Sequence, residues 1–191
     1  MATLPSVPLP PSAPLINQLA RDFYAVVPTD YRTYCSLTTQ IVQQVLEHFG
    51  VASERVPCQL WYCQPHHIYV LGFLGPGNPA HNPNKWDGHV VCCADHILID
   101  TATHHFEREF GLPVPWVVTT PMFGFPTPAL ARASLGEHDA LLWQSPPAHA
   151  DTRMPEEPQD LVAQYAQALI ARLKAQGQLA PPRQGMPPAR A

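Results

Sequence analysis

The stretch WDGHVVCCADHILIDTA, residues 86–102, has the pattern of a β-hairpin. Apolar and β-branched residues flank Ala94-Asp95, which is a candidate two-residue turn. With that turn, residues whose numbers sum to 189 face each other, so His89 is directly opposite Asp100. Opposed side chains have Cβ atoms about 4.5–5.5 Å apart, which allows a carboxylate to accept a hydrogen bond from an imidazole. A different turn would pair Val91 with Asp100 instead, and the alternative interpretation is a charge pair on a solvated face.

The segment CSLTTQIVQQVLEHFG, residues 35–50, carries the clearest helix pattern in the chain. Its apolar residues form a wide stripe, and Gly50 stands where a left-handed residue ends a helix. Thr33 or Ser36 can cap its start, which places Cys35 at or just before the first turn. The unpaired N–H groups and the dipole of a helix start favour a thiolate, the nucleophilic form of cysteine. The alternative is a small buried side chain, although the surrounding residues are mostly polar.

The rest of the pattern predicts helices near both ends of the chain and strands between them. We expect a helix over residues 15–26 and a last helix over residues 159–176, each with apolar side chains on one face. Strands are expected over residues 55–63, 66–75 and 114–121, with loops over residues 76–85 and 123–128. Helices first, then an antiparallel sheet and then a helix argue for the α+β class.

Length and composition indicate one domain. The 191 residues are 46% hydrophobic, which suffices for one substantial core but not comfortably for two. The 24 prolines divide the chain into short elements and loops. We expect a single domain over residues 14–179, with a proline-rich disordered tail over residues 1–13 and a second disordered tail over residues 180–191.

Charge and hydropathy argue against nucleic-acid and membrane partners, and cysteine usage indicates the cellular compartment. The formal net charge is −4 and no basic run exists, so we expect no nucleic-acid partner. No run of about 18 apolar residues and no secretory signal is found, so we expect no membrane association. Five cysteines make an odd number, and Cys92 and Cys93 would point to opposite faces of a strand, which fits a reducing compartment. We therefore expect a cytoplasmic protein, with export as an effector by a dedicated route left open.

Cys35, His89 and Asp100 together have the residue types of a thiol triad. Such a triad needs a nucleophile, a base that takes its proton and a carboxylate that orients the base. The opposed positions of His89 and Asp100 in the hairpin supply the base and the orienting group. Six competing histidines lack an equally placed carboxylate: His66, His67, His96, His104, His105 and His138.

Two stretches resemble the core of the papain-fold superfamily, in its transglutaminase-like and arylamine N-acetyltransferase-like branch: residues 34–57, YCSLTTQIVQQVLEHFGVASERVP, and residues 86–103, WDGHVVCCADHILIDTAT. In that pattern a cysteine opens a helix that ends in a Gly-Val or Gly-Ile step before the first strand, a histidine begins a later strand, and the motif D-x-T ends the next strand. The corresponding positions here are Cys35, Gly50-Val51, His89 and Asp100-Thr101-Ala102. The resemblance implies a papain-like α+β fold, in which the cysteine helix packs on an antiparallel sheet. It also implies a Cys–His–Asp site that transfers acyl groups through a thioester.

The implied reaction defines further site residues and partners. The backbone N–H of Cys35 is one candidate donor to the oxyanion, and Trp86, Tyr34 and Gln64 are candidates for the second donor or for substrate binding. We expect the substrate to be a protein or peptide amide or a small acyl donor. We expect no cofactor, because side chains alone can carry out this reaction.

Two other functions remain open from the sequence. The first is a non-catalytic papain-like interaction module that uses its proline-rich segments as contacts. The second is a zinc-binding protein, because four potential ligands fall within ten residues: Cys58, Cys63, His66 and His67. Their spacing matches no standard zinc site and a strand would separate their side chains, so no metal is expected.

Overall fold

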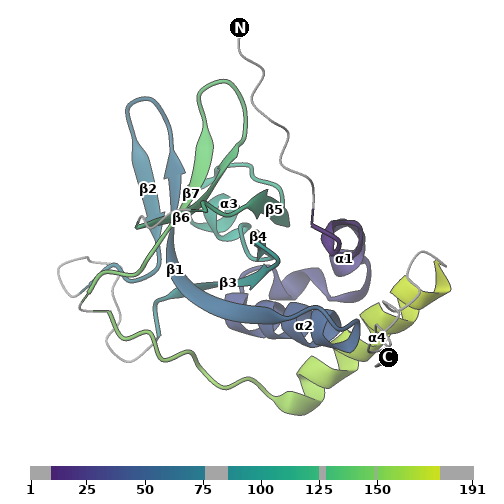
Figure 1. The fold of residues 1–191 in the computed structure, drawn as a ribbon. Coiled ribbons are helices and arrows are strands. Elements are labelled where there is room, and N and C mark those ends of the chain that lie inside the picture. Colours follow the sequence, from purple (N-terminus) through teal and green to yellow (C-terminus); the bar gives the residue numbers. More distant parts are fainter. Residues whose placement is uncertain (1–9, 76–85, 125–127, 149, 177–191) are drawn as a thin grey trace, which may run out of the picture.

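The computed structural model describes residues 10–75, 86–124, 128–148 and 150–176. Its helices are α1 (Ala13–Val26), α2 (Cys35–His48), α3 (His105–Phe110) and α4 (Gln159–Ala175), with a 3-10 turn at Thr29–Tyr31 (Figure 1). Its strands are β1 (Ser53–Cys63), β2 (Ile68–Leu71), β3 (His89–Ala94), β4 (Ile97–Asp100), β5 (Val118–Pro121), β6 (Ala129–Ser134) and β7 (Ala140–Gln144). The predicted α+β class is confirmed. Within the described residues, no helix has the length and apolar character needed to cross a membrane.

The strands form one antiparallel sheet in the order β5-β4-β3-β1-β7-β6, with β2 also paired to β1. The first half of β1 pairs with β3, where Cys58 lies opposite His89, and its second half pairs with β2 and β7. The two edge strands of this sheet, β5 and β6, come together. Met122, just beyond β5, bridges to Ala131 in β6, and the Thr120 hydroxyl donates to the Arg132 carbonyl at 2.8 Å. The sheet is therefore curled nearly into a barrel.

The curled sheet separates two hydrophobic cores. One core lies between the sheet and helices α1, α2 and α4, and the other lies inside the curl. Neighbouring residues of β3 contribute to different cores: Cys92 packs toward the helices, and Cys93 packs inside the curl with Val91. His89 has the same strand parity as Val91 and Cys93, so β3 presents it on the inner face of the sheet.

Helix α2, which begins at Cys35, ends as predicted, but its N-terminal cap differs from the prediction. Gly50 has a φ of 74°, the left-handed conformation expected after the last turn. The residue at the N-cap is Tyr34, and no side chain bonds the free N–H groups of the first turn, so the predicted cap by Thr33 or Ser36 is wrong. Cys35 is the first residue of α2.

Helix α1 begins earlier than predicted. It starts at Ala13 rather than at residue 15, and Ala13 is buried. The predicted tail over residues 1–13 is therefore too long at its C-terminal end. Residues 1–9 of that tail and the tail predicted over residues 180–191 lie outside the described residues.

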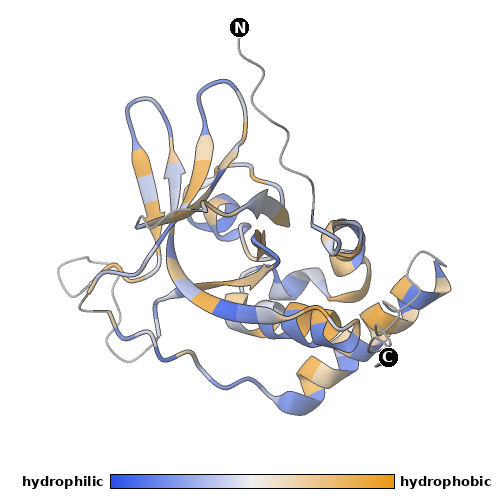
Figure 2. Ribbon diagram, viewed as in Figure 1, coloured by the Kyte–Doolittle hydropathy of each residue, from blue (hydrophilic) through white to orange (hydrophobic). Residues whose placement is uncertain are grey.

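Several sheet elements differ from the predictions. Strand β2 is only four residues long. Strand β5 begins at Val118 rather than at residue 114, and the intervening Pro115 has no N–H to donate to a neighbouring strand. Strands β6 and β7 and helix α3 were not predicted. The tips of the β1–β2 and β6–β7 hairpins are hydrophilic (Figure 2).

The hairpin of β3 and β4 has a different register from the predicted one. Asp95 and His96 both have positive φ, 46° and 62°, so they form the turn, and Ala94 pairs with Ile97. A type I′ turn needs positive φ at both central residues, and aspartate tolerates it better than alanine does. The direct pairing of His89 with Asp100 is therefore wrong. Because the shift is two residues, both side chains keep the same face and are diagonal neighbours.

Candidate active site

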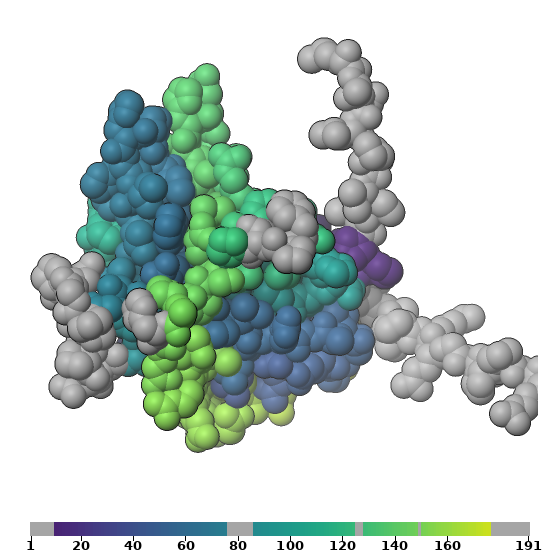
Figure 3. Space-filling view, turned by 60° about the vertical axis from the view of Figure 1, so that its left-hand side comes forward, coloured from purple at the N-terminus to yellow at the C-terminus, as the bar shows by residue number. Residues whose placement is uncertain are grey.

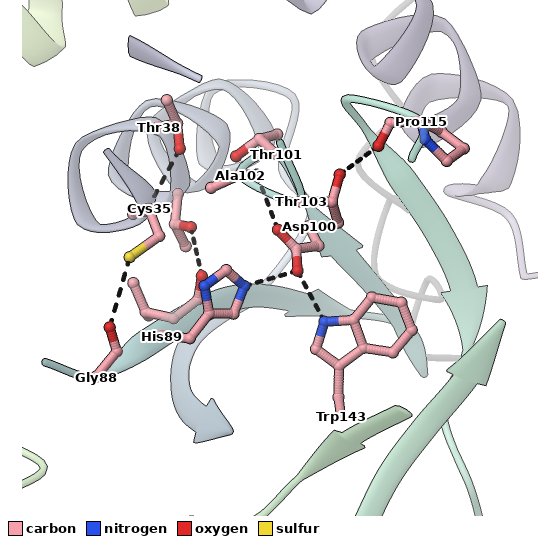
Figure 4. A network of polar contacts seen from close by, with 12 residues as sticks. Cys35, Thr38, Gly88, His89, Asp100, Thr101, Ala102, Thr103, Pro115 and Trp143 are labelled. Carbon is pink, nitrogen blue, oxygen red and sulfur yellow. Dashed lines mark hydrogen bonds and ion pairs between the residues drawn. The ribbon is translucent and has the colours of Figure 1, made fainter. Parts of the chain in front are cut away.

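His89 and Asp100 meet at the open end of the β3–β4 hairpin. His89 Nε2 lies 2.7 Å from Asp100 Oδ2, a hydrogen-bonded pair in which both side chains are almost completely buried (Figure 4). The diagonal placement thus gives the contact that the sequence predicted, through a different register.

Asp100 accepts hydrogen bonds from three donors. Its Oδ2 accepts from His89 and from Trp143 Nε1 at 2.8 Å, and its Oδ1 accepts from the backbone N–H of Ala102 at 2.8 Å. Burial by itself raises the pKa of an aspartate, but here the charge of His89 and these hydrogen bonds hold the pKa of Asp100 below its ordinary value. Asp100 is therefore a fixed buried anion next to the imidazole.

The His89 ring lies between Asp100 and Cys35, with Nδ1 on the Cys35 side (Figure 4). Burial disfavours the charged ring, but the charge and hydrogen bond of Asp100, together with Cys35, outweigh burial and raise the pKa of His89. The Cys35 Sγ also lies 3.9 Å from the Gly88 carbonyl oxygen. The arrangement places a protonatable base beside a thiol at a helix start.

A cavity of about 470 Å³ opens beside these residues. Its walls come from the first turn of α2, from β2, from the residues before β3 and from α3, and they include Cys35, His89, Tyr34, Trp86, Asp87, His105, Phe110 and Glu157. Tyr34 and Phe110 are exposed aromatic residues at this cavity. Cys35 thus borders an open cavity, although the residue itself is only 7% exposed.

The segment between β7 and α4 runs across the surface beside α2 (Figure 3). The Ser36 hydroxyl donates to the Pro155 carbonyl at 3.3 Å, and Met154 packs on the small cluster that contains Cys35. One wall of the cavity is thus held by a segment far away in the sequence.

Trp86 packs against the same cluster. Its ring packs edge-to-face on Phe73, with centroids 5.9 Å apart, and Gly88 leaves room for the indole. Its Nε1–H is buried, and no acceptor for it is found among the described residues. A buried donor without a partner commonly marks a bound water or a functional site.

Replacing Gly88 with alanine is expected to displace Trp86. A Cβ there would lie 2.3 Å from Cζ2 of Trp86 and 2.6 Å from Cζ of Phe73, so both rings must move. We expect the free energy of unfolding in urea to fall by about 1–3 kcal/mol, the cost of overpacking. The control is Gly136→Ala, where a Cβ meets no atom within 4 Å, and it should change stability by less than about 0.5 kcal/mol. Equal losses in both variants would contradict a specific fit of the indole to Gly88.

Three residues were predicted as the second oxyanion donor or as substrate contacts. Two of them lie at the cavity, and the third does not. Tyr34 and Trp86 line it. Gln64 instead lies just after β1 in the tip of the β1–β2 hairpin, where its Nε2 is 3.4 Å from Asp139 Oδ2. The proposed role of Gln64 at the site is therefore wrong, because the long β1 carries it to the far end of the sheet.

The four cysteines other than Cys35 belong to the sheet. Burial raises the pKa of the thiols of Cys58, Cys63, Cys92 and Cys93, so these thiols are poor nucleophiles at neutral pH. The described residues contain no group of three histidine, cysteine or acidic side chains that could hold a metal ion. The zinc ligands considered from the sequence also differ in burial, since Cys58 is fully buried whereas His66 and His67 are exposed.

Two residues of the site were not singled out from the sequence. Trp143 lies in β7, whose sequence ALLWQ is short and lacks clear alternation, so it gave no strand signal. His105 begins α3 and lies with its ring 6.3 Å from that of His89. Its only sequence signal was its position five residues after Asp100.

No protein-family model, curated protein or solved structure matches this chain. The α+β class follows from the structure alone, and the resemblance to papain-like enzymes stays a prediction. Any statement about function therefore depends on the geometry of Cys35, His89 and Asp100.

Proposed function

We propose that this protein is a thiol-dependent enzyme that transfers acyl groups through a thioester on Cys35. The observation that carries the proposal is the buried His89–Asp100 pair, whose imidazole faces a cysteine at the first residue of a helix. A buried ion pair of this kind is costly to build for stability alone, and perturbed pKa values cluster at functional sites.

The proposed reaction begins with the proton of the Cys35 thiol moving to His89. The sulfur then attacks the carbonyl carbon of an amide or thioester, forming a C–S bond. His89 returns the proton to the leaving amine or thiol as the carbon–nitrogen or carbon–sulfur bond breaks. Water or an amine then attacks the thioester, gives its proton to His89 and releases the acyl product with regeneration of the Cys35 thiol. Asp100 stabilises the imidazolium in both halves of the cycle.

The first turn of α2 supports the negative oxygen of the tetrahedral intermediate. The N–H of Cys35 has no partner within its own helix, because the first four N–H groups of a helix never do. Trp86 is the better of the remaining candidates for the second donor, since its Nε1–H is buried without a described acceptor. Tyr34 is 55% exposed and fits a substrate contact at the rim better.

The proposed substrate is an amide of a protein or peptide, or a small acyl donor, and the acceptor is water or an amine. The mechanism uses side chains and backbone donors alone, so the proposal includes no cofactor. Hydrolysis, deamidation and transfer share these steps and differ only in the acceptor that reaches the thioester.

The first test is the pH dependence of Cys35 alkylation by iodoacetamide, followed by peptide mass spectrometry. An unactivated cysteine is less than about 1% thiolate at pH 6, because an ordinary thiol has a pKa of about 8.5. We expect wild-type Cys35 to react at pH 6 at least about tenfold faster than Cys35 in His89→Gln, with similar rates at pH 10. His138→Gln is the matched control, because His138 is exposed at the β6–β7 hairpin tip, and it should behave as wild type.

Slow alkylation at pH 6 in both wild type and His89→Gln would contradict an activated Cys–His pair and favour the interaction-module alternative. Fast alkylation would justify screening amides and thioesters for a covalent acyl adduct on Cys35. The four sheet cysteines serve as internal negative controls in the same digest.

A further inference from the structure

Helix α3 bonds to the residue two positions before Cys35. Arg108 Nη1 donates to the Thr33 hydroxyl at 2.9 Å, and Arg108 Nη2 lies 3.4 Å from His105 Nδ1. Arginine can only donate, so Nδ1 of His105 is the acceptor and Nε2 carries the hydrogen. The backbone of Thr33 also acts on the His105 ring, because it raises the pKa of His105 against the effect of burial. Arg108 therefore links His105 to the Thr33 hydroxyl.

His105 also lies against the base of the proposed reaction. Its ring meets that of His89 edge-to-face, with centroids 6.3 Å apart and an interplanar angle of 84°. Burial and the charges of His89 and Arg108 lower the pKa of His105 to about 4, against the smaller opposing effects of Thr33 and Asp100. His105 stays neutral at neutral pH and keeps the single tautomer whose Nδ1 accepts from Arg108.

Few side chains outside α3 contact the start of α2: the Ser36 hydroxyl donates to the Pro155 carbonyl, and the Tyr34 ring packs on Tyr31. Tyr34 occupies the N-cap without a side-chain hydrogen bond to the first turn, and its carbonyl is bound by Thr38 from within the helix. The first residue of this helix is Cys35, so the position of the thiol depends on how the preceding residues are held. The contacts from α3 fix Thr33, two positions before Cys35.

We propose that His105 is a positioning residue, which acts with Arg108 through Thr33 to hold the Cys35 thiol in place beside His89. This inference rests on the proposed function, because it concerns the geometry of the same Cys–His pair. We assign His105 no catalytic step, because its Nδ1 is engaged by Arg108 and its contact with His89 is ring to ring.

The test uses the full-length protein and the ratio of the Cys35 alkylation rates at pH 6 and pH 10. The ratio reports activation by His89, whereas a change in general access to the thiol alters both rates together. We expect His105→Leu to lower the ratio by about tenfold, because misplacing a reacting group by about 1 Å costs up to about 100-fold. His105→Gln keeps a donor near the Nε2 position and should restore most of the ratio. His104→Gln is the matched control, because His104 pairs with Glu107 instead, and it should equal wild type.

Two results would overturn the inference while leaving the proposed function intact. One is a wild-type ratio in His105→Leu together with a lowered ratio in His89→Gln. The other is an equal loss in His105→Leu and His105→Gln, which would indicate ring packing rather than the polar link to Thr33. A wild-type ratio in His89→Gln would instead remove the proposed function itself. If His105→Leu does not fold, as judged by circular dichroism, Arg108→Gln replaces it and should lower the ratio in the same direction, since Arg108 is half-exposed.

Discussion

Replacing Asp100 with asparagine is expected to lower the rate of acyl transfer by about 10⁴-fold, the loss found when the carboxylate of a nucleophile–histidine–aspartate triad becomes an amide. An amide carries no charge to stabilise the imidazolium of His89. It also cannot satisfy its neighbours, because Trp143 and His89 bond to one oxygen of Asp100 and the Ala102 N–H bonds to the other. In either orientation, the NH₂ group of asparagine faces a donor. Alkylation of Cys35 at pH 6 should fall in parallel.

The matched control for this change is Asp139→Asn. Asp139 accepts a hydrogen bond from the Tyr62 hydroxyl at 2.8 Å, but it lies at the tip of the β6–β7 hairpin away from the cavity. We expect wild-type alkylation at pH 6 and wild-type turnover of the first substrate identified. An Asp100→Asn protein that is folded and as reactive as wild type would show that His89 needs no carboxylate partner, and the triad would be wrong.

The sequence was sufficient for the parts of the fold that local pattern determines. The apolar stripe and terminal glycine of α2 specified that helix to within a few residues, because each signal depends only on neighbouring residues. Strands β6 and β7 escaped prediction because ALARAS and ALLWQ carry little alternation, and they become strands only by pairing with β1 and with each other. Closure of the sheet at Met122 and Ala131 is likewise a long-range contact that no local pattern encodes.

In the candidate site, too, local pattern predicted some residues and long-range contacts placed the others. His89 and Asp100 were found because face parity survives a two-residue error in register, whereas a one-residue error would have separated them. Trp143, whose indole N–H donates to Asp100, was missed because it lies in a strand that the sequence did not predict. Gln64 was misplaced because the length of β1 decides which end of the sheet a residue reaches. The role of His105 depends on how α3 docks on Thr33, which is a tertiary contact.

Replacing Trp143 with phenylalanine is expected to lower the free energy of unfolding at pH 7 by about 3 kcal/mol, because a hydrogen bond to a charged group contributes about 1.5–3 kcal/mol and the smaller ring also leaves a void. Trp143 is fully buried, and its Nε1 donates to Asp100 at 2.8 Å. Urea unfolding measures the loss. The matched control is Trp61→Phe, since Trp61 is only partly buried and its Nε1 donates to neutral Gln59 at 3.3 Å, and we expect a loss below about 1 kcal/mol.

The pH dependence of that loss identifies its cause. The folded protein holds the pKa of Asp100 below its ordinary value, so the stability that Asp100 contributes is present above the unfolded pKa of about 3.9 and is lost as the pH falls through the folded pKa. Because the indole hydrogen bond helps to lower that pKa, the difference between wild type and Trp143→Phe should be largest near pH 7 and shrink as the pH falls through the folded pKa values of Asp100, which lie below its ordinary value. A difference that stays constant through the pH range in which Asp100 becomes protonated in both folded proteins would mean that the indole stabilises the protein by packing alone. The charge of Asp100 would then depend on Ala102 and His89, and Trp143 would have no part in setting the proton affinity of the base.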